Sequence, residues 1–369
     1  MNYKRLSDVA YYSELRTRDI TIENYITTDN MLPNIGGICT ASSIPDCKTA
    51  RYYEEGDILL SNIRPYFCKI WYANRCGSAS NDVLVIKNRE DIDSKFLYYV
   101  LCDKNFFNYD TVTSKGTKMP RGTPNAIMKY LVPDVDDKVQ KKIASVLSAY
   151  DDLIEKNNRK IEILQDMAEE LYKEWFVRFR FPGYKTAKLT DGIPDGWEVD
   201  RVEGLGVFKR GKNITASEMI DGDIPVISAG IEPSGFHNEA NVEGVSITIS
   251  SSGANAGYMR INYSDIWAAD CMYVNNVDNV FYLYELLNNI RPYIDNLQRG
   301  AAQPHVYAKD VNRLKIVLPA EEIRTKFNDI VKDMHLSIAT LMKQNDILKQ
   351  QRDLLLPRLM SGKLAVKVS

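Results

Sequence analysis

The sequence predicts an α+β protein in which two mixed α/β domains are separated by two long antiparallel helices that form a coiled coil. Three observations predict this fold. Two long stretches repeat apolar residues at alternating spacings of four and three, the second stretch lies 184 residues after the first, and the short motifs between them recur in the same order. Because this internal repeat spans half of the 369 residues, we expect pseudo-twofold symmetry.

The first long helix is predicted within residues 134–181. Its inward positions have the heptad pattern of a coiled-coil seam, and they are Ile143, Leu147, Tyr150, Ile154, Asn157, Ile161, Leu164, Ala168, Leu171 and Trp175. Charged residues lie between them, as on a solvated outer face. The acids at 134, 136 and 137 are interpreted as caps of the helix N-terminus rather than as metal ligands. The sequence FPG at 181–183 is expected to mark its end.

The second long helix is predicted within residues 320–369. Its seam positions are Phe327, Val331, Met334, Ile338, Leu341, Asn345, Leu348, Arg352, Leu355 and Leu359. One asparagine interrupts each seam, and such a residue usually fixes the register of a coiled coil. The two apolar stripes can cover each other if the helices lie antiparallel. This arrangement predicts a dumbbell, with one domain at each end and a fixed distance between the two.

The remaining segments, residues 1–133 and 182–319, are predicted to be the two mixed domains. In the first, strands are expected near 57–61, 69–72 and 82–86, then one helix at 94–105 and a turn-rich basic loop at 114–124. The second domain repeats this order, with a strand at 245–250, a helix at 281–287 and a loop at 299–304.

Composition limits the classes of function. Apolar residues make up 44% of the chain and charged residues 26%, which is ordinary for a soluble globular protein. No window is long and apolar enough for a membrane span or a signal peptide. The six cysteines lack metal-ligand spacing, so we expect no metal site and interpret them as reduced, mostly buried thiols of a cytoplasmic protein. With a net charge of −2, any affinity for nucleic acid must come from local basic clusters.

Catalytic motifs are weak. Gly206, Gly211 and Lys212 match the start of a phosphate-binding loop, but Asn213 stands where a magnesium-binding Ser or Thr is required, and no helix pattern comes after it. We interpret this stretch as a strand end and a basic turn. A phosphate- or nucleotide-binding enzyme built on it remains an alternative. The three histidines show no persuasive triad, and His335 is expected on the surface or at the seam edge of the second long helix.

Binding chemistry on loops is the main remaining signal. Basic residues can contact phosphates or guanine, and carboxamides can read adenine. The candidates are Arg64, Lys69, Arg75, Lys115, Lys118 and Arg121 in the first domain, and Lys209, Arg210, Lys212, Asn255, Arg260, Arg299, Gln303 and Lys309 in the second. The aromatic residues Tyr52, Tyr53, Tyr66, Tyr72, Tyr258 and Tyr263 are interpreted as core or strand-face residues rather than as base-stacking platforms.

Three segments in this order resemble the DNA-specificity subunit of type I restriction-modification systems over essentially the whole chain. They are AEELYKEWFVRF at 168–179, IPDGWEV at 193–199 and LLPRLMSGKL at 355–364. In this family a turn containing Glu and Gln usually starts each long helix. Gln140 has the expected distance to Ile143, whereas Arg324 stands where the second Gln is expected.

The resemblance implies a non-catalytic subunit with two target-recognition domains, each reading one half of a split, asymmetric site in double-stranded DNA. It implies helices that act as spacer and as docking surface for two methylation subunits, with restriction subunits completing the nuclease. The aromatic residues at the end of the first long helix exceed what two helices need, so we expect Trp175 to anchor a partner helix there. S-adenosylmethionine, ATP and magnesium would then be bound by the partners and not by this chain. A coiled-coil scaffold without DNA specificity is the remaining alternative of another class.

Overall fold

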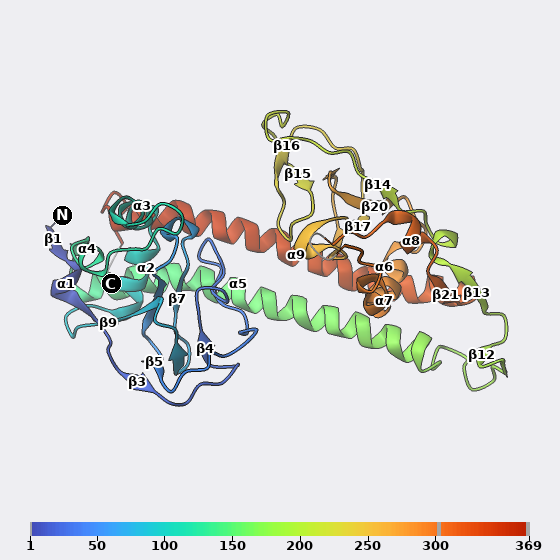
Figure 1. Ribbon diagram of the computed structural model, residues 1–369, viewed down its shortest axis with the longest axis horizontal. Coiled ribbons are helices and arrows are strands. Elements are labelled where there is room, and N and C mark those ends of the chain that lie inside the picture. The colour runs from blue at the N-terminus through green and yellow to red at the C-terminus, as the bar shows by residue number, and fades with distance from the viewer. Residues whose placement is uncertain (1, 301–303, 367–369) are drawn as a thin grey trace. The chain divides into compact units, whose positions relative to one another are not determined.

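The structure, a computed structural model, describes residues 2–300 and 304–366 (Figure 1). Its internal contacts divide the chain into two units, Met1–Glu155 with Asn345–Ser369, and Lys156–Gln344. Each unit therefore contains one mixed α/β head and a part of each long helix. No described helix is both long enough and apolar enough to cross a membrane.

The two long helices are α5, Asp137–Tyr172, and α9, Glu321–Met360. A turn of π-helix, Lys173–Val177, continues α5. In the first unit the beginning of α5 packs against the end of α9, with Leu147 and Leu359 in one apolar core. In the second unit the end of α5 packs against the beginning of α9. The helices therefore run in opposite directions in each unit.

The predicted seam positions face inward. Each of these seam residues is buried or half-buried, including the two asparagines, Asn157 and Asn345. Complete burial of a Leu or Ile side chain contributes about 1.5–3 kcal/mol. The apolar stripe therefore turns the seam face of each helix toward the apolar core of the unit in which that part of the helix lies. The exposed apolar residues of the helices, such as Ile163 and Leu336, lie outside the seam.

The first head begins with an antiparallel pair of strands that joins its two ends, β1 with β10. Its elements, in chain order, are β1 Asn2–Arg5, α1 Leu6–Val9, β2 Ala10–Tyr12, β3 Arg16–Thr17, β4 Tyr25–Ile26, β5 Ala50–Tyr53, β6 Ile58–Ser61, the 3-10 turn η1 Pro65–Phe67, β7 Ile70–Tyr72, β8 Gly77–Ala79, β9 Val83–Asn88, α2 Ser94–Cys102, α3 Lys104–Thr113, α4 Pro124–Ile127 and β10 Leu131–Asp134.

The core of the first head is built on a four-stranded sheet with the order β2-β9-β6-β7. Alternate residues of β6 point to opposite faces, as in any strand. Ile58 and Leu60 pack with α2 and the long helices. Leu59 instead packs in a separate core with Tyr53 and Trp71, which includes residues of a second sheet, β3-β5-β8-β4. Both faces of the central sheet are therefore covered.

The second head repeats this plan. Its elements are β11 Leu189–Thr190, β12 Ile193–Pro194, β13 Glu198–Arg201, η3 Val202–Gly204, β14 Lys209–Arg210, β15 Ile224–Ile227, β16 Gly235–His237, β17 Ser246–Ser250, η4 Gly253–Asn255, β18 Met259–Asn262, β19 Trp267–Ala268, β20 Cys271–Asn275, α6 Val280–Asn289, α7 Arg291–Asp295, α8 Ala308–Asn312 and β21 Lys315–Leu318.

The strand orders confirm the internal repeat. The sheet β14-β20-β17-β18 has the same order as β2-β9-β6-β7, and β13 pairs with β21 as β1 pairs with β10. The expected strands 57–61, 69–72 and 82–86 are β6, β7 and β9. The prediction of one helix at 94–105 is wrong, because α2 ends at Cys102 and Asp103 caps a second helix by accepting a hydrogen bond from the Asn105 amide (2.7 Å).

Two expectations for polar and aromatic residues of the long helices are wrong. His335 is buried, not superficial: its Nε2 lies 3.0 Å from Oε1 of Glu285 on α6, and its Nδ1 lies 2.9 Å from the Tyr263 hydroxyl. Trp175, which we expected to anchor a partner helix, is only 8% exposed. It packs edge-on against Phe327 within the core of the second unit.

The helix starts explain the departure at Arg324. Gln140 is buried, and its carboxamide accepts a hydrogen bond from the Asp93 amide, just before α2, and donates one to the Val135 carbonyl (both 2.8 Å). In the second unit, Asn328 accepts from the amides of Phe281 and Tyr282 at the start of α6 (3.1 and 3.3 Å). Asn328 lies one helical turn beyond Arg324. In the second unit the carboxamide of Asn328 therefore takes the place of the expected Gln and accepts hydrogen bonds from the unpaired amides at the start of the helix that comes after the sheet.

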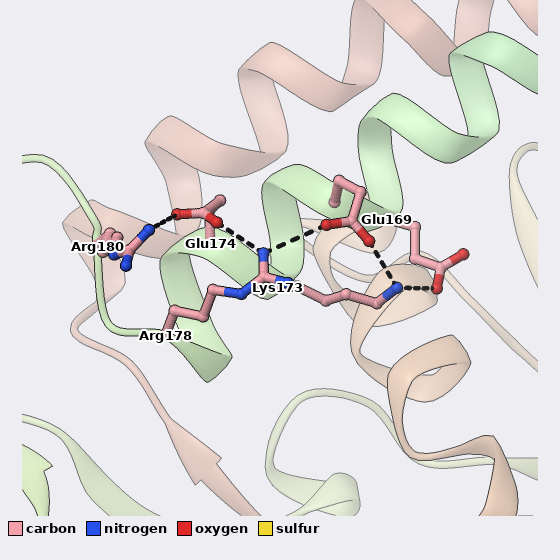
Figure 2. A network of polar contacts seen from close by, with 6 residues as sticks. Glu169, Lys173, Glu174, Arg178 and Arg180 are labelled. Carbon is pink, nitrogen blue, oxygen red and sulfur yellow. Dashed lines mark hydrogen bonds and ion pairs between the residues drawn. The ribbon is translucent and has the colours of Figure 1, made fainter.

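The AEELYKEWFVRF segment carries a network of ion pairs (Figure 2). Lys173 contacts Glu169 (2.5 Å) and Glu170 (2.9 Å), and Arg178 contacts Glu174 (2.6 Å). These groups are largely solvent-accessible, so each pair adds little stability. Arg178 and Arg180 both pair with Glu174, while the aromatic residues of the segment enter the core.

Candidate nucleic-acid interface

In each head, two loops join at one end of the central sheet. In the first head they are residues 62–69, between β6 and β7, and residues 114–122, after α3. Three backbone contacts connect and close them: the Gly122 amide donates to the Asn62 carbonyl, the Arg64 amide donates to the Pro120 carbonyl, and Lys115 and Arg121 exchange two hydrogen bonds. We call these segments the first loop pair.

The second head has the same construction in residues 251–257 and 299–306, except that residues 301–303 lie outside the described part of the chain. The Val306 amide donates to the Ser251 carbonyl, the Gly253 amide donates to the Pro304 carbonyl, and Arg299 and His305 exchange two hydrogen bonds. These contacts match those of the first loop pair one for one. We call these segments the second loop pair, and the candidate residue Gln303 belongs to its undescribed portion.

Five of the six basic candidates of the first head lie in the first loop pair, and four of them form its charged surface. Lys115, Lys118 and Arg121 are exposed, and the Arg121 guanidinium contacts Asp82, which directly precedes β9 (3.0 Å). Arg64 is half-buried, with its guanidinium 6.0 Å from the ring centre of Phe67. Exposed cations that converge on one end of a sheet can track a phosphate backbone.

Lys69, the last residue of the loop 62–69, and Arg75, which lies outside the loop pair, are held by other contacts. The Lys69 ammonium donates to the Thr28 carbonyl (2.6 Å) and lies 5.8 Å from the centre of the Phe67 ring. Arg75 lies over Trp71 and donates to the Glu23 carbonyl (3.1 Å), away from the loop pair. Lys69 therefore supports the first loop pair, whereas Arg75 does not belong to it.

The second loop pair borders a hollow of about 350 Å³. Its polar lining includes Arg210, Ser252, Asp270 and His305, and the Ser252 hydroxyl hydrogen-bonds to the Asp270 carboxylate. Asp270 directly precedes β20, as Asp82 precedes β9. The two heads thus place an acid at the same point, paired with arginine in one and with a serine hydroxyl in the other. A carboxylate of this kind can accept a hydrogen bond from the amino group of cytosine.

The other candidates of the second head are spread around this hollow. Arg299 contacts Asp310 (3.2 Å), and Lys309 lies over the ring of Tyr307, a residue that lines the hollow. Asn255 lies in η4, at the tip of the second loop pair. The Arg260 guanidinium lies over the ring of Tyr258, and Arg260 itself is on β18, beyond the loop. Lys209 is exposed on β14, next to Arg210.

The phosphate-loop alternative is wrong. The Gly211 amide donates to the Cys271 carbonyl (2.8 Å) and the Lys212 amide to the Ala268 carbonyl (2.9 Å), so neither amide is free to hold a phosphate. A Cβ atom on Gly211 would lie 2.4 Å from the Ala269 carbonyl oxygen, so this glycine serves a close strand contact. The Lys212 ammonium lies over Trp267, and the next element is a turn rather than a helix.

The sequence interpretation missed four residues of this site: Tyr66 and Phe67 in the first loop pair, and Asp82 and Asp270, whose carboxylates contact residues of the two loop pairs. Asp82 and Asp270 could have been found, because each stands immediately before the matching strand of the repeat. The exposure of the aromatic pair carries no signal in the sequence, since an aromatic next to a strand usually enters a core.

The cysteines partly contradict expectation. None of the six forms a disulfide, but Cys39, Cys47 and Cys76 are exposed, and only Cys102 and Cys271 are buried. Burial raises the pKa of the Cys271 thiol to about 12, so it stays protonated. Among the described residues no group of three His, Cys, Asp or Glu side chains is arranged to hold a metal ion.

Comparisons with known proteins agree on one family. The model of the family described as type I restriction modification DNA specificity domain matches residues 2–165 and again 194–350. The MjaIX specificity subunit of a type I restriction enzyme from Methanocaldococcus jannaschii is 27% identical over 355 residues, covering 89% of this chain and 82% of that protein. The HindI specificity subunit from Haemophilus influenzae is 21% identical over 434 residues, covering 92% of this chain and 94% of the other.

A solved structure has a similar fold. The S subunit of a type I restriction-modification system from M. genitalium superposes with a TM-score of 0.59 at 18% identity, covering 97% of this chain and 96% of that one. Because the superposition covers 97% of this chain, the similarity in fold extends over both heads and both long helices.

Proposed function

This chain belongs to the type I restriction-modification DNA specificity family, and from this membership we propose that each of its two heads reads one half of a split DNA site. The chain is a sequence-specific DNA-recognition subunit and is not itself an enzyme. One observation carries the proposal for the heads: both loop pairs are closed by the same three backbone contacts but bear different side chains. One scaffold that presents two different surfaces suits an asymmetric site.

Mapping modified bases tests this function directly. Host DNA with the intact gene should carry methylation at one bipartite sequence, and DNA from a strain without the gene should lack it. Exchange of the second loop pair for that of a relative should alter one half of the sequence and leave the other half unchanged. A change in both halves, or in neither, would contradict the assignment of one half-site to each head.

Replacing Lys115, Lys118 and Arg121 with alanine should flatten the salt dependence of DNA binding. Each lost phosphate contact lowers the slope of log K against log salt by about 0.9, so the triple variant should lose up to about 2.7. Base preference should survive, because phosphate contacts carry no sequence information directly. Binding titrations at several salt concentrations provide the measurement.

The control for this experiment removes the same charge elsewhere. Lys138, Lys141 and Lys142 are exposed on α5 and lie outside both loop pairs. Their replacement with alanine should leave the slope nearly unchanged. Equal slopes in both triple variants would show that the loop cations are only solvated charges.

We further propose that the long helices act as spacer and as the docking surface for two methylation subunits. The second unit offers a suitable surface. A groove of about 740 Å³ lies between α5 and α9, lined by Lys160, Ile163, Leu164, Asp333, Leu336, Ser337, Thr340 and Leu341. Apolar side chains inside a rim of charged ones are typical of protein interfaces. A partner helix would complete a four-helix bundle there.

Leu336→Glu should weaken binding of a methylation subunit by more than about 1 kcal/mol, because a charge would enter the centre of this groove. Copurification and titration of the partner provide the measurement. Val112→Glu is the matched control, since Val112 is an exposed apolar residue on α3 and lies outside the groove. Unchanged partner binding by the Leu336 variant would place the docking surface elsewhere.

The remaining parts of the proposal derive from the family. We propose target-recognition domains at residues 1–133 and 182–319 and spacer helices at 134–181 and 320–369. Restriction subunits would join the methylation subunits in the full complex, which would work in the cytoplasm. S-adenosylmethionine, ATP and magnesium would be bound by those partners.

A further inference from the structure

Strained backbone is concentrated at the tip of the first loop pair. Of the eight described non-glycine residues with positive φ, two lie in this tip, Arg64 and Cys68, and two lie in the segment bonded to it, Asn34 and Ile35, all with φ between 50° and 58°. Ile35 is β-branched, for which this conformation is especially unfavourable. Such residues persist only where the surrounding structure enforces them, and they cluster at functional sites.

Hydrogen bonds show what enforces this conformation. The Asn34 amide donates to the Phe67 carbonyl (2.8 Å), the Ile35 amide to the Cys68 carbonyl (2.9 Å), and the Arg64 amide to the Pro120 carbonyl (2.8 Å). The tip is therefore tied on one side to the segment around residue 34 and on the other to the basic loop. Its backbone is fixed before any ligand arrives.

This fixed tip presents two aromatic rings to solvent. Tyr66 is 49% exposed and Phe67 is 38% exposed, and their ring centres lie 4.8 Å apart. The interpretation of Tyr66 as a core or strand-face residue is therefore wrong. The charged groups of Arg64 and Lys69 lie 6.0 and 5.8 Å from the Phe67 ring centre. Two exposed rings flanked by two cations match the combination that binds unstacked bases between phosphates.

The second head shows that the fold itself does not require these rings. Gly253 makes the backbone contact that Arg64 makes in the first head, and it has a φ of +76°, which glycine adopts without strain. The next residues are Ala254 and Asn255, where the first head has Pro65 and Tyr66. The first head thus keeps large side chains at a position where small ones allow the same backbone.

We propose that Tyr66 and Phe67 form an aromatic wedge that inserts at a base step of the first half-site, with Arg64 beside it on the DNA backbone. This inference rests on the proposed function and specifies how the first head reads DNA. Apolar wedges of this kind unstack a base step and kink the duplex. Recognition in the first half-site then depends on how easily that step deforms, whereas the second head has the small polar side chain of Asn255 at the corresponding position of its loop.

The test uses the complex of the full chain with its methylation subunits and DNA carrying the mapped site. 2-Aminopurine, whose fluorescence rises when it is unstacked, replaces one base at a time in each half-site. With the parent protein, fluorescence should rise at one step of the first half-site. Phe67→Ala and Tyr66→Ala should abolish this rise and weaken specific binding by about 5- to 150-fold, the equivalent of ~1–3 kcal/mol for a lost stacking contact.

Controls separate the wedge from general effects. Tyr11 is likewise exposed, at 44%, and has the Arg89 guanidinium 5.5 Å from its ring centre, but it lies on the regular strand β2. Tyr11→Ala should behave as the parent does. Phe67→Leu preserves an apolar side chain that can still insert and should retain part of the fluorescence signal, while Phe67→Trp should retain it.

Three results would overturn the wedge. Parent-like affinity and fluorescence in both alanine variants would show that the rings do not contact DNA. Loss of methylation-subunit binding with unchanged DNA preference would make the tip a protein interface. An unaltered fluorescence signal at every step with the parent protein, together with tight specific binding, would refute insertion while leaving the proposed function intact. Failure of the parent complex to bind any specific site would instead refute the proposed function.

Discussion

Lengthening both long helices by four residues should lengthen the gap between the two methylated half-sites by one or two base pairs. Four helical residues add roughly 6 Å and rotate the rest of the helix by about 40°, and DNA rises about 3.4 Å per base pair. The insertions belong after Glu155 and after Gln344, where each helix passes from one unit to the other. Neither position interrupts a head. This prediction tests the proposal that the helices act as spacer.

Matching the two insertions matters because the helices run antiparallel in each unit. A single insertion in α5 would leave α9 unchanged. Part of the added length could then be absorbed where the two helices pack, so we expect the gap between the half-sites to lengthen by one base pair. Four residues act as a local stutter that keeps the seam near register. A matched insertion of seven residues, one full heptad, adds about 10.5 Å and should lengthen the gap by about three base pairs.

Methylation mapping of the variants measures the gap directly. Both half-sites should keep their sequences, and the parent site should no longer be modified. An active variant that still methylates the original spacing would show that the long helices do not set it. Loss of all methylation would be checked by partner binding, since the groove between α5 and α9 lies wholly in the second unit.

Asp110→Asn should stabilise the first unit at pH 8 and change its stability little at pH 4. Asp110 is completely buried on α3, and neither of its carboxylate oxygens has a hydrogen-bond partner among the described residues. Burial raises the pKa of this carboxyl from its ordinary value to about 7. A Cβ atom on Gly122 would lie 2.7 Å from its Oδ1, so the carboxyl lies close beneath the first loop pair with no room to spare.

Linkage between protonation and folding determines the sign. The folded state holds the Asp110 proton up to about pH 7, whereas the unfolded chain releases it near pH 4. The unfolded state is therefore increasingly favoured as the pH rises from about 4 to about 7. Each pKa unit corresponds to about 1.36 kcal/mol, so this group destabilises the folded unit by roughly 3–5 kcal/mol above pH 7. Asparagine cannot ionise and removes that effect.

Urea unfolding at pH 4 and pH 8 checks this prediction, with hydrogen exchange of the α3 amides to report on the first unit alone. The gain at pH 8 should exceed any change at pH 4 by several kcal/mol. Asp152→Asn is the control, because Asp152 is exposed on α5 and its substitution should not alter the pH dependence. A parent protein whose stability is flat between pH 4 and pH 8 would show that Asp110 stays ionised or gains a partner.

Periodic patterns were enough to predict much of the architecture. The 3–4 spacing defines one face of a helix whatever packs on it, so Leu147, Ile154 and Ile338 could be assigned to the inner face from the sequence. The offset of 184 residues likewise predicted the repeat, which the equal strand orders confirm. The basic loops at 115–121 and 299–305 could be matched because both are turn-rich segments at the same place in that repeat.

The tertiary structure decided what periodicity does not encode. The helical pattern includes Trp175 and leaves His335 at its edge. Only the packed head shows that Phe327 covers Trp175 and that Glu285 pairs with His335. Contacts between distant segments decide these outcomes, and their sequence separations carry no local signal.

The candidate site divides in the same way. Residue type and position in the repeat indicated the basic loops, because charge is a property of single residues. The pairing of Ser252 with Asp270, the exposure of Phe67 and the positive φ of Arg64 arise only when loops from different parts of the chain meet and fix one another. The sequence by itself therefore determined the helical seams and the two-head repeat, while the surface that each head presents was decided by tertiary contacts between loops.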